Sequence, residues 1–349
     1  QDFGSKGAEH MEVDSPSPWF PCPGCDRVVT GLVQGKGPKR RDYYSSTHCC
    51  FECQRGEGHH SDWGCAGIPS AIFREIALPD SQGTAHCLVH RPEQSCALPV
   101  VLFLHGGVTY VYPETLWWDV RELVQKNRVV REEFVVIAPF ATANEPLAVV
   151  SETRTKTDRF GNIVSYVDDF DEERLWTAFV GACQTLGPKS VDWSRLYVVG
   201  YSMGGQSTWN LIVRYGSRLA AAVPFAGCCA WRDDAWNMEE SMLRELRGLP
   251  IRSYNGEDDT GTFAWRDFMW LAQRRGLAKH PAQRTEAHLE GVELSVYEWG
   301  EHLQLCLVRG TASSHCCWDV IFHNEESFLL FSWLQKLRCA APLFETEGV

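Results

Sequence analysis

Residues 198–205 read Val-Val-Gly-Tyr-Ser-Met-Gly-Gly, with a G-x-S-x-G match at 200–204 and Ser202 at its centre. This motif is typical of a serine on a sharp turn between a strand and a helix, where flanking glycines leave room for a strained backbone. The small residues that follow are compatible with a helix, whose first N–H groups would point at a developing oxyanion. The stretch therefore predicts an exposed, nucleophilic serine at the end of a strand.

Apolar segments alternate with helical patterns on both sides of this turn. We expect strands at residues 85–90, 99–104, 134–139, 192–200, 219–227, 251–255 and 292–299, and helices at residues 116–126, 175–186, 239–246, 263–275 and 327–337. Strands that alternate with helices imply a parallel sheet covered on both faces. Residues 68–345 are therefore predicted to form an α/β domain, a doubly wound and mostly parallel sheet.

Residues that could assist the serine should follow strand ends, because catalytic groups gather outside the carboxyl ends of parallel strands. The tripeptide His105-Gly106-Gly107 comes directly after the predicted strand at 99–104. Its glycines allow the backbone to turn N–H groups towards the serine. We expect the N–H groups of Gly107 and Met203 to form an oxyanion hole.

The acid and the base should follow the serine in chain order. Three acids crowd the loop after the predicted strand at 251–255, and among them we choose Asp259, with Asp258 in reserve. Two histidines follow the last predicted strand, His302 and His315. The local pattern alone favours His302 slightly, because it lies nearer the end of that strand.

Several stretches resemble one known superfamily. They are LPVVLFLHGG (98–107), VDWSRLYVVGYSMGGQSTW (191–209), AAAVPFAG (220–227), NGEDD (255–259) and HCCWDVIF (315–322). On these, residues 85–337 resemble the α/β-hydrolases, in particular esterases of the polyhydroxyalkanoate-depolymerase-like and feruloyl-esterase-like kind and the related predicted peptidases. The resemblance implies that the base is His315 with Trp318 packed beside it, and that the acid is Asp259.

Two segments depart from that resemblance. Residues 149–173 are unusually polar and charged, which fits either a lid or substrate-lining insert or a solvated surface loop. Residues 301–314 add length between the last predicted strand and His315, which keeps His302 as the reserve base.

The N-terminal region has a different composition. Residues 1–18 are polar and are expected to be a disordered tail, whereas residues 19–67 are rich in Cys and His. Two C-x-x-C pairs favour a structural zinc site over disulfides or free thiols. The simplest ligand set is Cys22, Cys25, Cys50 and Cys53, and the further candidates are Cys49, His59, His60 and Cys65. No cofactor is expected for catalysis.

Charge and cysteine usage narrow the function classes. A net charge of −12 argues against nucleic-acid binding and against anionic membranes, and no apolar stretch approaches the roughly 18 residues of a membrane span. The clustered C-x-x-C pairs favour reduced or metal-bound cysteines and so a cytoplasmic location. Residues 1–18 do not resemble a signal peptide. Because the chain starts with Gln1 rather than Met, residues upstream of it are expected.

Together these patterns predict a serine hydrolase that cleaves small-molecule carboxylic esters through Ser202, His315 and Asp259. A serine peptidase is the nearest alternative, because the same three residues cleave amides. The alternative from another class is a non-catalytic adaptor, in which the 19–67 module binds a protein partner and the larger domain is only a scaffold.

Overall fold

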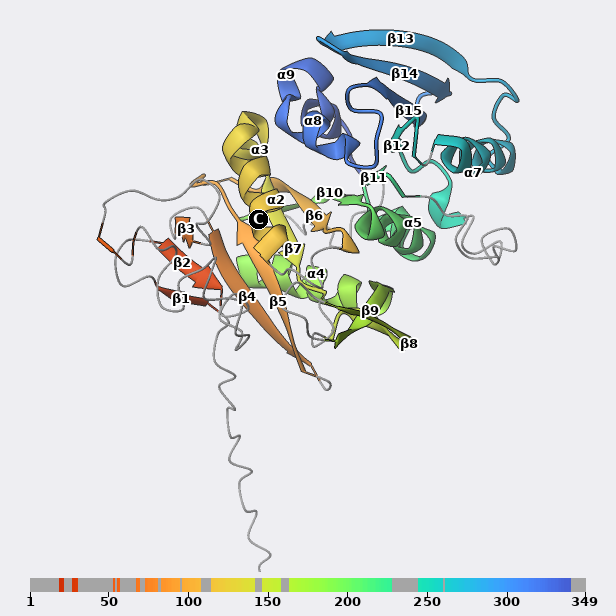
Figure 1. Ribbon diagram of the computed structural model, residues 1–349. Coiled ribbons are helices and arrows are strands. Elements are labelled where there is room, and N and C mark those ends of the chain that lie inside the picture. The colour runs from red at the N-terminus through yellow and green to blue at the C-terminus, as the bar shows by residue number, and fades with distance from the viewer. Residues whose placement is uncertain are drawn as a thin grey trace, which may run out of the picture. The chain divides into compact units, whose positions relative to one another are not determined.

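The structure is a computed structural model. It describes residues 19–21, 27–30, 53, 55–56, 67–69, 73–80, 83–94, 96–107, 114–141, 146–157, 163–227, 244–259 and 261–339 (Figure 1). The chain divides into two compact units, Gln1–Gly67 and Ile68–Val349.

In the first unit, β1 (Trp19–Pro21) and β2 (Arg27–Thr30) pair antiparallel, and β3 (Gly67–Pro69) spans the boundary between the units. Of the predicted metal ligands only Cys53, which is buried, is among the described residues; Cys22, Cys25, Cys49, Cys50, His59, His60 and Cys65 lie outside them. Within the described part of the chain, no group of three or more His, Cys, Asp or Glu side chains is arranged to hold a metal ion. The zinc site thus stays a sequence prediction, without support from the structure.

The second unit is built on a ten-stranded sheet with the order β13-β14-β15-β12-β11-β10-β6-β7-β5-β4. Its strands are β4 (Phe73–Asp80), β5 (Gly83–His90), β6 (Leu98–Leu104), β7 (Val135–Pro139), β10 (Val191–Tyr201), β11 (Ala221–Phe225), β12 (Ile251–Gly256), β13 (Ala282–Leu289), β14 (Val292–Trp299) and β15 (Leu303–Gly310). The six neighbours from β15 to β7 run parallel. The sheet is therefore mostly parallel at its centre, as the sequence predicts.

Both edges of the sheet are antiparallel. On one side β13 pairs with β14 and β14 with β15; on the other, β4 pairs with β5 and β5 with β7. The sequence patterns do not predict β4, β13 or β15. The omission of β15 affects the site, because this strand occupies most of the segment 301–314 that is interpreted above as added length.

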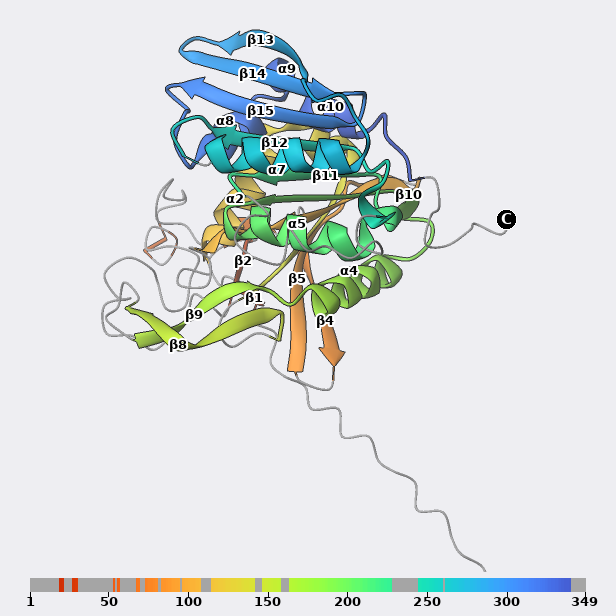
Figure 2. The ribbon, with the colours of Figure 1, turned by 90° about the vertical axis from the view of Figure 1, so that its right-hand side faces the viewer.

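Helices cover both faces of this sheet (Figures 1 and 2). One face carries α2 (Glu114–Lys126), α3 (Arg128–Glu133), α8 (Cys317–His323), α9 (Glu325–Phe328) and α10 (Leu330–Leu334); the other carries α4 (Glu172–Leu186), α5 (Met203–Tyr215) and α7 (Gly261–Arg274). The single helix predicted at 327–337 is instead two short helices, broken at Leu329, where φ is 50°. Most of the helix predicted at 239–246 lies outside the described residues. No described helix has the length and apolar character needed to cross a membrane.

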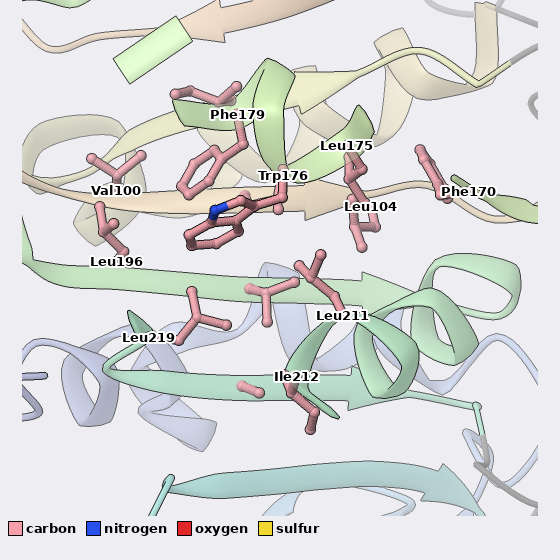
Figure 3. Close-up of a cluster of buried hydrophobic side chains, with 14 of the residues drawn as sticks. Val100, Leu104, Phe170, Leu175, Trp176, Phe179, Leu196, Leu211, Ile212 and Leu219 are labelled. Carbon is pink, nitrogen blue, oxygen red and sulfur yellow. The ribbon is translucent and has the colours of Figure 1, made fainter. Parts of the chain in front are cut away.

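The core lies between the sheet and its helices. All seven residues of β6 are buried, which fits its continuous apolar sequence. In Figure 3, Trp176 and Phe179 of α4 and Leu211 of α5 point towards the strands that carry Val100 and Leu196. Burial of each such side chain contributes about 1.5–3 kcal/mol to folding, and this packing fixes β6 and β10, whose ends carry the site.

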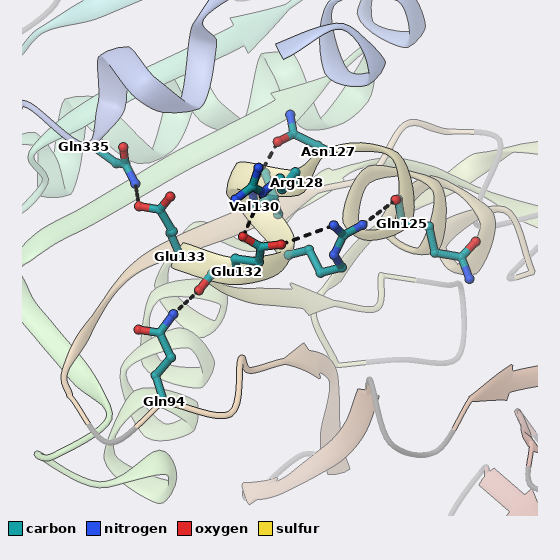
Figure 4. Close-up of polar contacts among 9 residues, drawn as sticks. Gln94, Gln125, Asn127, Arg128, Val130, Glu132, Glu133 and Gln335 are labelled. Atoms are coloured by element: carbon teal, nitrogen blue, oxygen red, sulfur yellow. Dashed lines mark hydrogen bonds and ion pairs between the residues drawn. The ribbon is translucent and has the colours of Figure 1, made fainter. Parts of the chain in front are cut away.

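Polar contacts fix the corner between α2 and α3, on the face of the sheet that also carries α8 (Figure 4). Asn127 caps α3 by accepting a hydrogen bond of 3.1 Å from the N–H of Val130. The same side chain donates to the carbonyl of Phe322 in α8, at 3.1 Å. Because α8 begins two residues after His315, this contact helps hold the segment that carries the predicted base.

The described residues between 149 and 170 form neither a free loop nor part of the main sheet. Here β8 (Ala148–Thr157) and β9 (Ile163–Phe170) make a two-stranded antiparallel pair. Near the end of β9 the buried carboxylate of Asp169 accepts hydrogen bonds from Ser207 and Asn210 of α5. The pair is therefore anchored on the helix that follows Ser202, so the interpretation of these described residues as a solvated surface loop is wrong.

Candidate active site

Ser202 occupies the turn between β10 and α5, in a conformation that few residues adopt. Its φ is 55° and its ψ is −118°, a strained combination for a residue with a side chain. Two backbone hydrogen bonds hold it: its N–H donates to Phe225 at 2.9 Å, and its carbonyl accepts from Gln206 at 3.0 Å. A Cβ on Gly204 would lie only 2.2 Å from the carbonyl oxygen of Leu104, so the turn requires glycine there.

Ser202, His315 and Asp259 form one hydrogen-bonded chain. Nε2 of His315 lies 2.9 Å from Oγ of Ser202, and Nδ1 lies 2.7 Å from Oδ2 of Asp259. The chain is satisfied when Nδ1 carries the proton and donates it to the carboxylate, which leaves Nε2 to accept from the serine hydroxyl. The imidazole side chain is 46% exposed, so solvent and solutes reach it.

Asp258 points elsewhere. Its carboxylate accepts a hydrogen bond of 2.6 Å from the hydroxyl of Ser313, and its N–H donates to the carbonyl of Ser313 at 3.1 Å. These bonds join the loop after β12 to the loop after β15. The reserve acid therefore connects the two loops that carry Asp259 and His315.

His302 lies at the other end of the sheet. Its carbonyl accepts a hydrogen bond of 2.7 Å from the N–H of Ile251, which begins β12, whereas Asp259 follows the end of the same strand. β15 runs parallel to β12 and carries the chain from His302 to the site. The reserve base thus cannot reach Ser202, and the local preference for it is wrong because a further strand follows His302.

The loop at residues 105–107, here called the 105–107 loop, lies against Ser202. A Cβ on Gly106 would stand 3.4 Å from the Cβ of Ser202. His105 is fully buried; its Nδ1 lies 2.9 Å from the carbonyl oxygen of Gly106, and its Nε2 accepts from the N–H of Ala141 at 3.1 Å. Burial lowers the pKa of His105 to about 4, so a neutral imidazole braces this loop.

The two predicted oxyanion donors belong to segments next to Ser202 in the chain or in space. Met203 begins α5 directly after Ser202, and the first N–H groups of a helix have no acceptor within the helix. Gly107 ends the 105–107 loop, next to Gly106. Each donor therefore belongs to a segment that reaches Ser202, and their role as an oxyanion hole stays a prediction.

Aromatic rings pack against the histidine of the site. Trp318 meets the imidazole of His315 edge to face, with ring centroids 5.3 Å apart, and stacks on Tyr201, with centroids 4.4 Å apart. The Tyr201 hydroxyl donates to the carboxylate of Asp119 on α2. Neither Tyr201 nor Asp119 is among the residues that the sequence motifs indicate. Tyr201 is an aromatic residue within the G-x-S-x-G motif, whereas no local pattern marks Asp119.

A serine on a strand-to-helix turn, followed in chain order by an acid and a histidine from loops after later strands of one central sheet, is the pattern of the α/β-hydrolases. The chain has the α/β-hydrolase fold. This agrees with the resemblance carried by the sequence motifs.

In the comparisons with known proteins, only solved structures are similar to this chain. No family model and no curated protein matches the sequence. Similar solved structures include a thermostable esterase (18% identity, 77% of this chain, TM-score 0.49), and this chain spans 64% of that esterase's length. An acetyl xylan esterase from Aspergillus awamori (18% identity, 72% of this chain and 98% of that one, TM-score 0.43) and a 2,6-dihydroxy-pseudo-oxynicotine hydrolase (13% identity, 79% and 72%, TM-score 0.45) are also similar.

Proposed function

We propose that the chain is a serine hydrolase that cleaves carboxylic esters of small molecules. The observation that carries the proposal is the relay of hydrogen bonds from Ser202 through His315 to Asp259, with distances of 2.9 and 2.7 Å. A nucleophile, a base and an orienting acid within hydrogen-bond reach are what covalent acyl transfer requires.

In the first half of the reaction, Oγ of Ser202 attacks the ester carbonyl carbon while Nε2 of His315 takes the hydroxyl proton. Asp259 keeps Nδ1 protonated and stabilises the imidazolium that forms. The negative charge on the former carbonyl oxygen rests on the N–H groups of Met203 and Gly107. The bond to the alcohol oxygen then breaks, and the proton on Nε2 passes to the leaving alcohol.

In the second half, water attacks the acyl group on Ser202. His315 accepts a proton from the water and returns it to Oγ of the serine, so the acid is released and the enzyme is restored. No metal or organic cofactor is needed for either half.

The test is hydrolysis of p-nitrophenyl acetate by the full chain and by Ser202→Ala. Without the nucleophile, kcat should fall by at least about 10⁴-fold. Ser313→Ala is the matched control, because it also removes one hydroxyl from the neighbouring loops, and it should keep nearly full activity. If Ser202→Ala hydrolyses the ester as fast as the unaltered chain does, the proposal fails. If the unaltered chain itself does not hydrolyse the ester, the adaptor alternative gains.

A further inference from the structure

We propose that Tyr201 and Asp119 form a positioning pair that couples the 105–107 loop to His315. The inference rests on the proposed function, since it assigns these residues to the support of that reaction. Neither side chain is placed among the reacting groups: Tyr201 precedes Ser202, and Asp119 lies on α2.

The Tyr201 ring touches the 105–107 loop. A Cβ on Gly106 would come within 2.5 Å of Cε2 of Tyr201, so the backbone of Gly106 rests on the edge of the ring. The same Cβ position is 3.4 Å from the Cβ of Ser202. A shift of the ring would therefore change how closely the proposed oxyanion donor Gly107 approaches the serine.

The same ring also supports the base. Its stack on Trp318 is close to parallel, at 28°, and Trp318 in turn meets His315 at 87°. Because the His315 side chain is nearly half exposed, this aromatic contact is a main constraint on its position beyond the two hydrogen bonds of the relay. Tyr201 thus contacts the 105–107 loop directly and is linked to His315 through the ring of Trp318.

Asp119 anchors the ring at its hydroxyl end. The Tyr201 hydroxyl donates to Oδ2 of Asp119, a partly buried residue on the helix that follows the 105–107 loop along the chain. Desolvation raises the pKa of Asp119 to about 7, with Asp319 and Glu122 adding to the increase and the Tyr201 hydrogen bond opposing it. A carboxyl group kept in so unfavourable a place, with the tyrosine hydroxyl as its hydrogen-bond partner, fits an anchoring role.

Loss of this anchor should affect turnover more than substrate binding. Without the hydroxyl, the ring keeps its stack but can tilt, and misplacement of a catalytic group by 1 Å can cost about 10²-fold in rate. For a partial tilt we expect Tyr201→Phe to lower kcat about tenfold and to leave KM nearly unchanged.

The experiment compares four variants in the hydrolysis of p-nitrophenyl acetate. Asp119→Ala should match the kcat loss of Tyr201→Phe, and the double variant should lose no more than either one alone. Asp119→Asn should restore most of the rate, because its amide oxygen still accepts the hydrogen bond. The control is Tyr197→Phe, which removes another tyrosine hydroxyl on β10, bonded to the Leu337 carbonyl at 2.9 Å. It should lower the melting temperature as Tyr201→Phe does and leave kcat unchanged.

Several results would overturn the pair. They are a kcat of Tyr201→Phe within about twofold of the unaltered chain, losses that multiply in the double variant, Asp119→Asn as slow as Asp119→Ala, or an equal kcat loss in the Tyr197→Phe control. If Asp119→Ala does not fold, Tyr201→Phe and Asp119→Asn decide the matter. Failure of the proposed function is distinct: Ser202→Ala would then retain turnover, and the pair would fall with it. Failure of the pair alone leaves Ser202→Ala inactive and Tyr201→Phe fully active.

Discussion

At the scale of single residues, Ser202 combines backbone strain with hydrogen bonding. A non-glycine residue at a φ of 55° costs on the order of 1–3 kcal/mol, and it persists only where the surroundings over-determine it. Here the surroundings are the backbone bonds to Phe225 and Gln206. In this conformation Oγ lies 2.9 Å from Nε2 of His315, which is the arrangement the proposed chemistry needs.

The two neighbouring acids should respond very differently to the same substitution. Asp259→Asn removes the charge that orients His315 and should lower kcat by about 10³- to 10⁴-fold. Asp258→Asn disturbs only the contact with Ser313 and should cost less than about threefold. Steady-state kinetics on both variants checks this, and the reverse ranking would mean that the acid is wrongly assigned.

Buried His105 predicts a pH dependence of stability. An unfolded histidine titrates near pH 6.5, whereas the folded one stays neutral down to about pH 4. Between these values the unfolded state binds more protons, so the stability contributed by the neutral imidazole is complete above pH 6.5 and is lost as the pH falls towards 4. The loss at pH 5 should be about 2 kcal/mol.

His105→Gln supplies the comparison, because glutamine retains a donor and an acceptor but does not titrate. Urea unfolding at pH 7.5 and pH 5 should show a smaller decrease in the free energy of unfolding for this variant than for the unaltered chain. An equal decrease in both would rule out the assigned state of His105.

At the scale of elements, the turn between β10 and α5 could be predicted because its requirements are local. Motif and chain order also led to the loop carrying Asp259. The choice between His302 and His315 needed the resemblance, since the local pattern favoured the wrong one. The cause is β15: Gly300 at a φ of 66° makes a short turn, and the chain returns as another strand before it reaches His315.

A comparison of two helix glycines tests the packing of this turn. Gly204→Ala in α5 would place a Cβ 2.2 Å from the carbonyl oxygen of Leu104, and we expect a loss of about 1–3 kcal/mol in the free energy of unfolding together with reduced activity. Gly181→Ala in α4 meets only the flexible end of Leu78 at 3.3 Å, and gains up to about 1 kcal/mol of helix propensity. Denaturant unfolding of the two variants measures the difference. Equal stabilities would show that the turn is less tightly packed than described.

At the scale of the whole molecule, the site is assembled from distant parts of the chain. His315 lies 113 residues from Ser202 and 56 from Asp259, and the Tyr201 hydrogen bond to Asp119 spans 82 residues. A sequence pattern can name residues that follow strand ends, but only the packed sheet determines which ends meet. No local pattern links a carboxylate on a helix to a tyrosine on a strand. The positioning pair of Tyr201 and Asp119 therefore could not be predicted from the sequence.

The zinc prediction belongs to this scale as well, since it concerns the whole N-terminal unit, Gln1–Gly67. If the 19–67 module holds a structural site, the purified chain should contain about one equivalent of zinc. Chelation should then lower the stability of this module and leave ester hydrolysis intact. Metal analysis that finds only trace zinc would leave disulfides or free thiols as the explanation of the cysteines.

The most direct test of the central claim is covalent labelling of the folded chain with a fluorophosphonate probe, followed by mapping of the adduct by mass spectrometry. Such a probe reacts with a serine that a neighbouring base has activated. The account predicts one adduct, on Ser202, which is absent in Ser202→Ala and forms far more slowly in His315→Ala. A folded chain that takes up no probe, or one that is labelled equally well without Ser202, would contradict it.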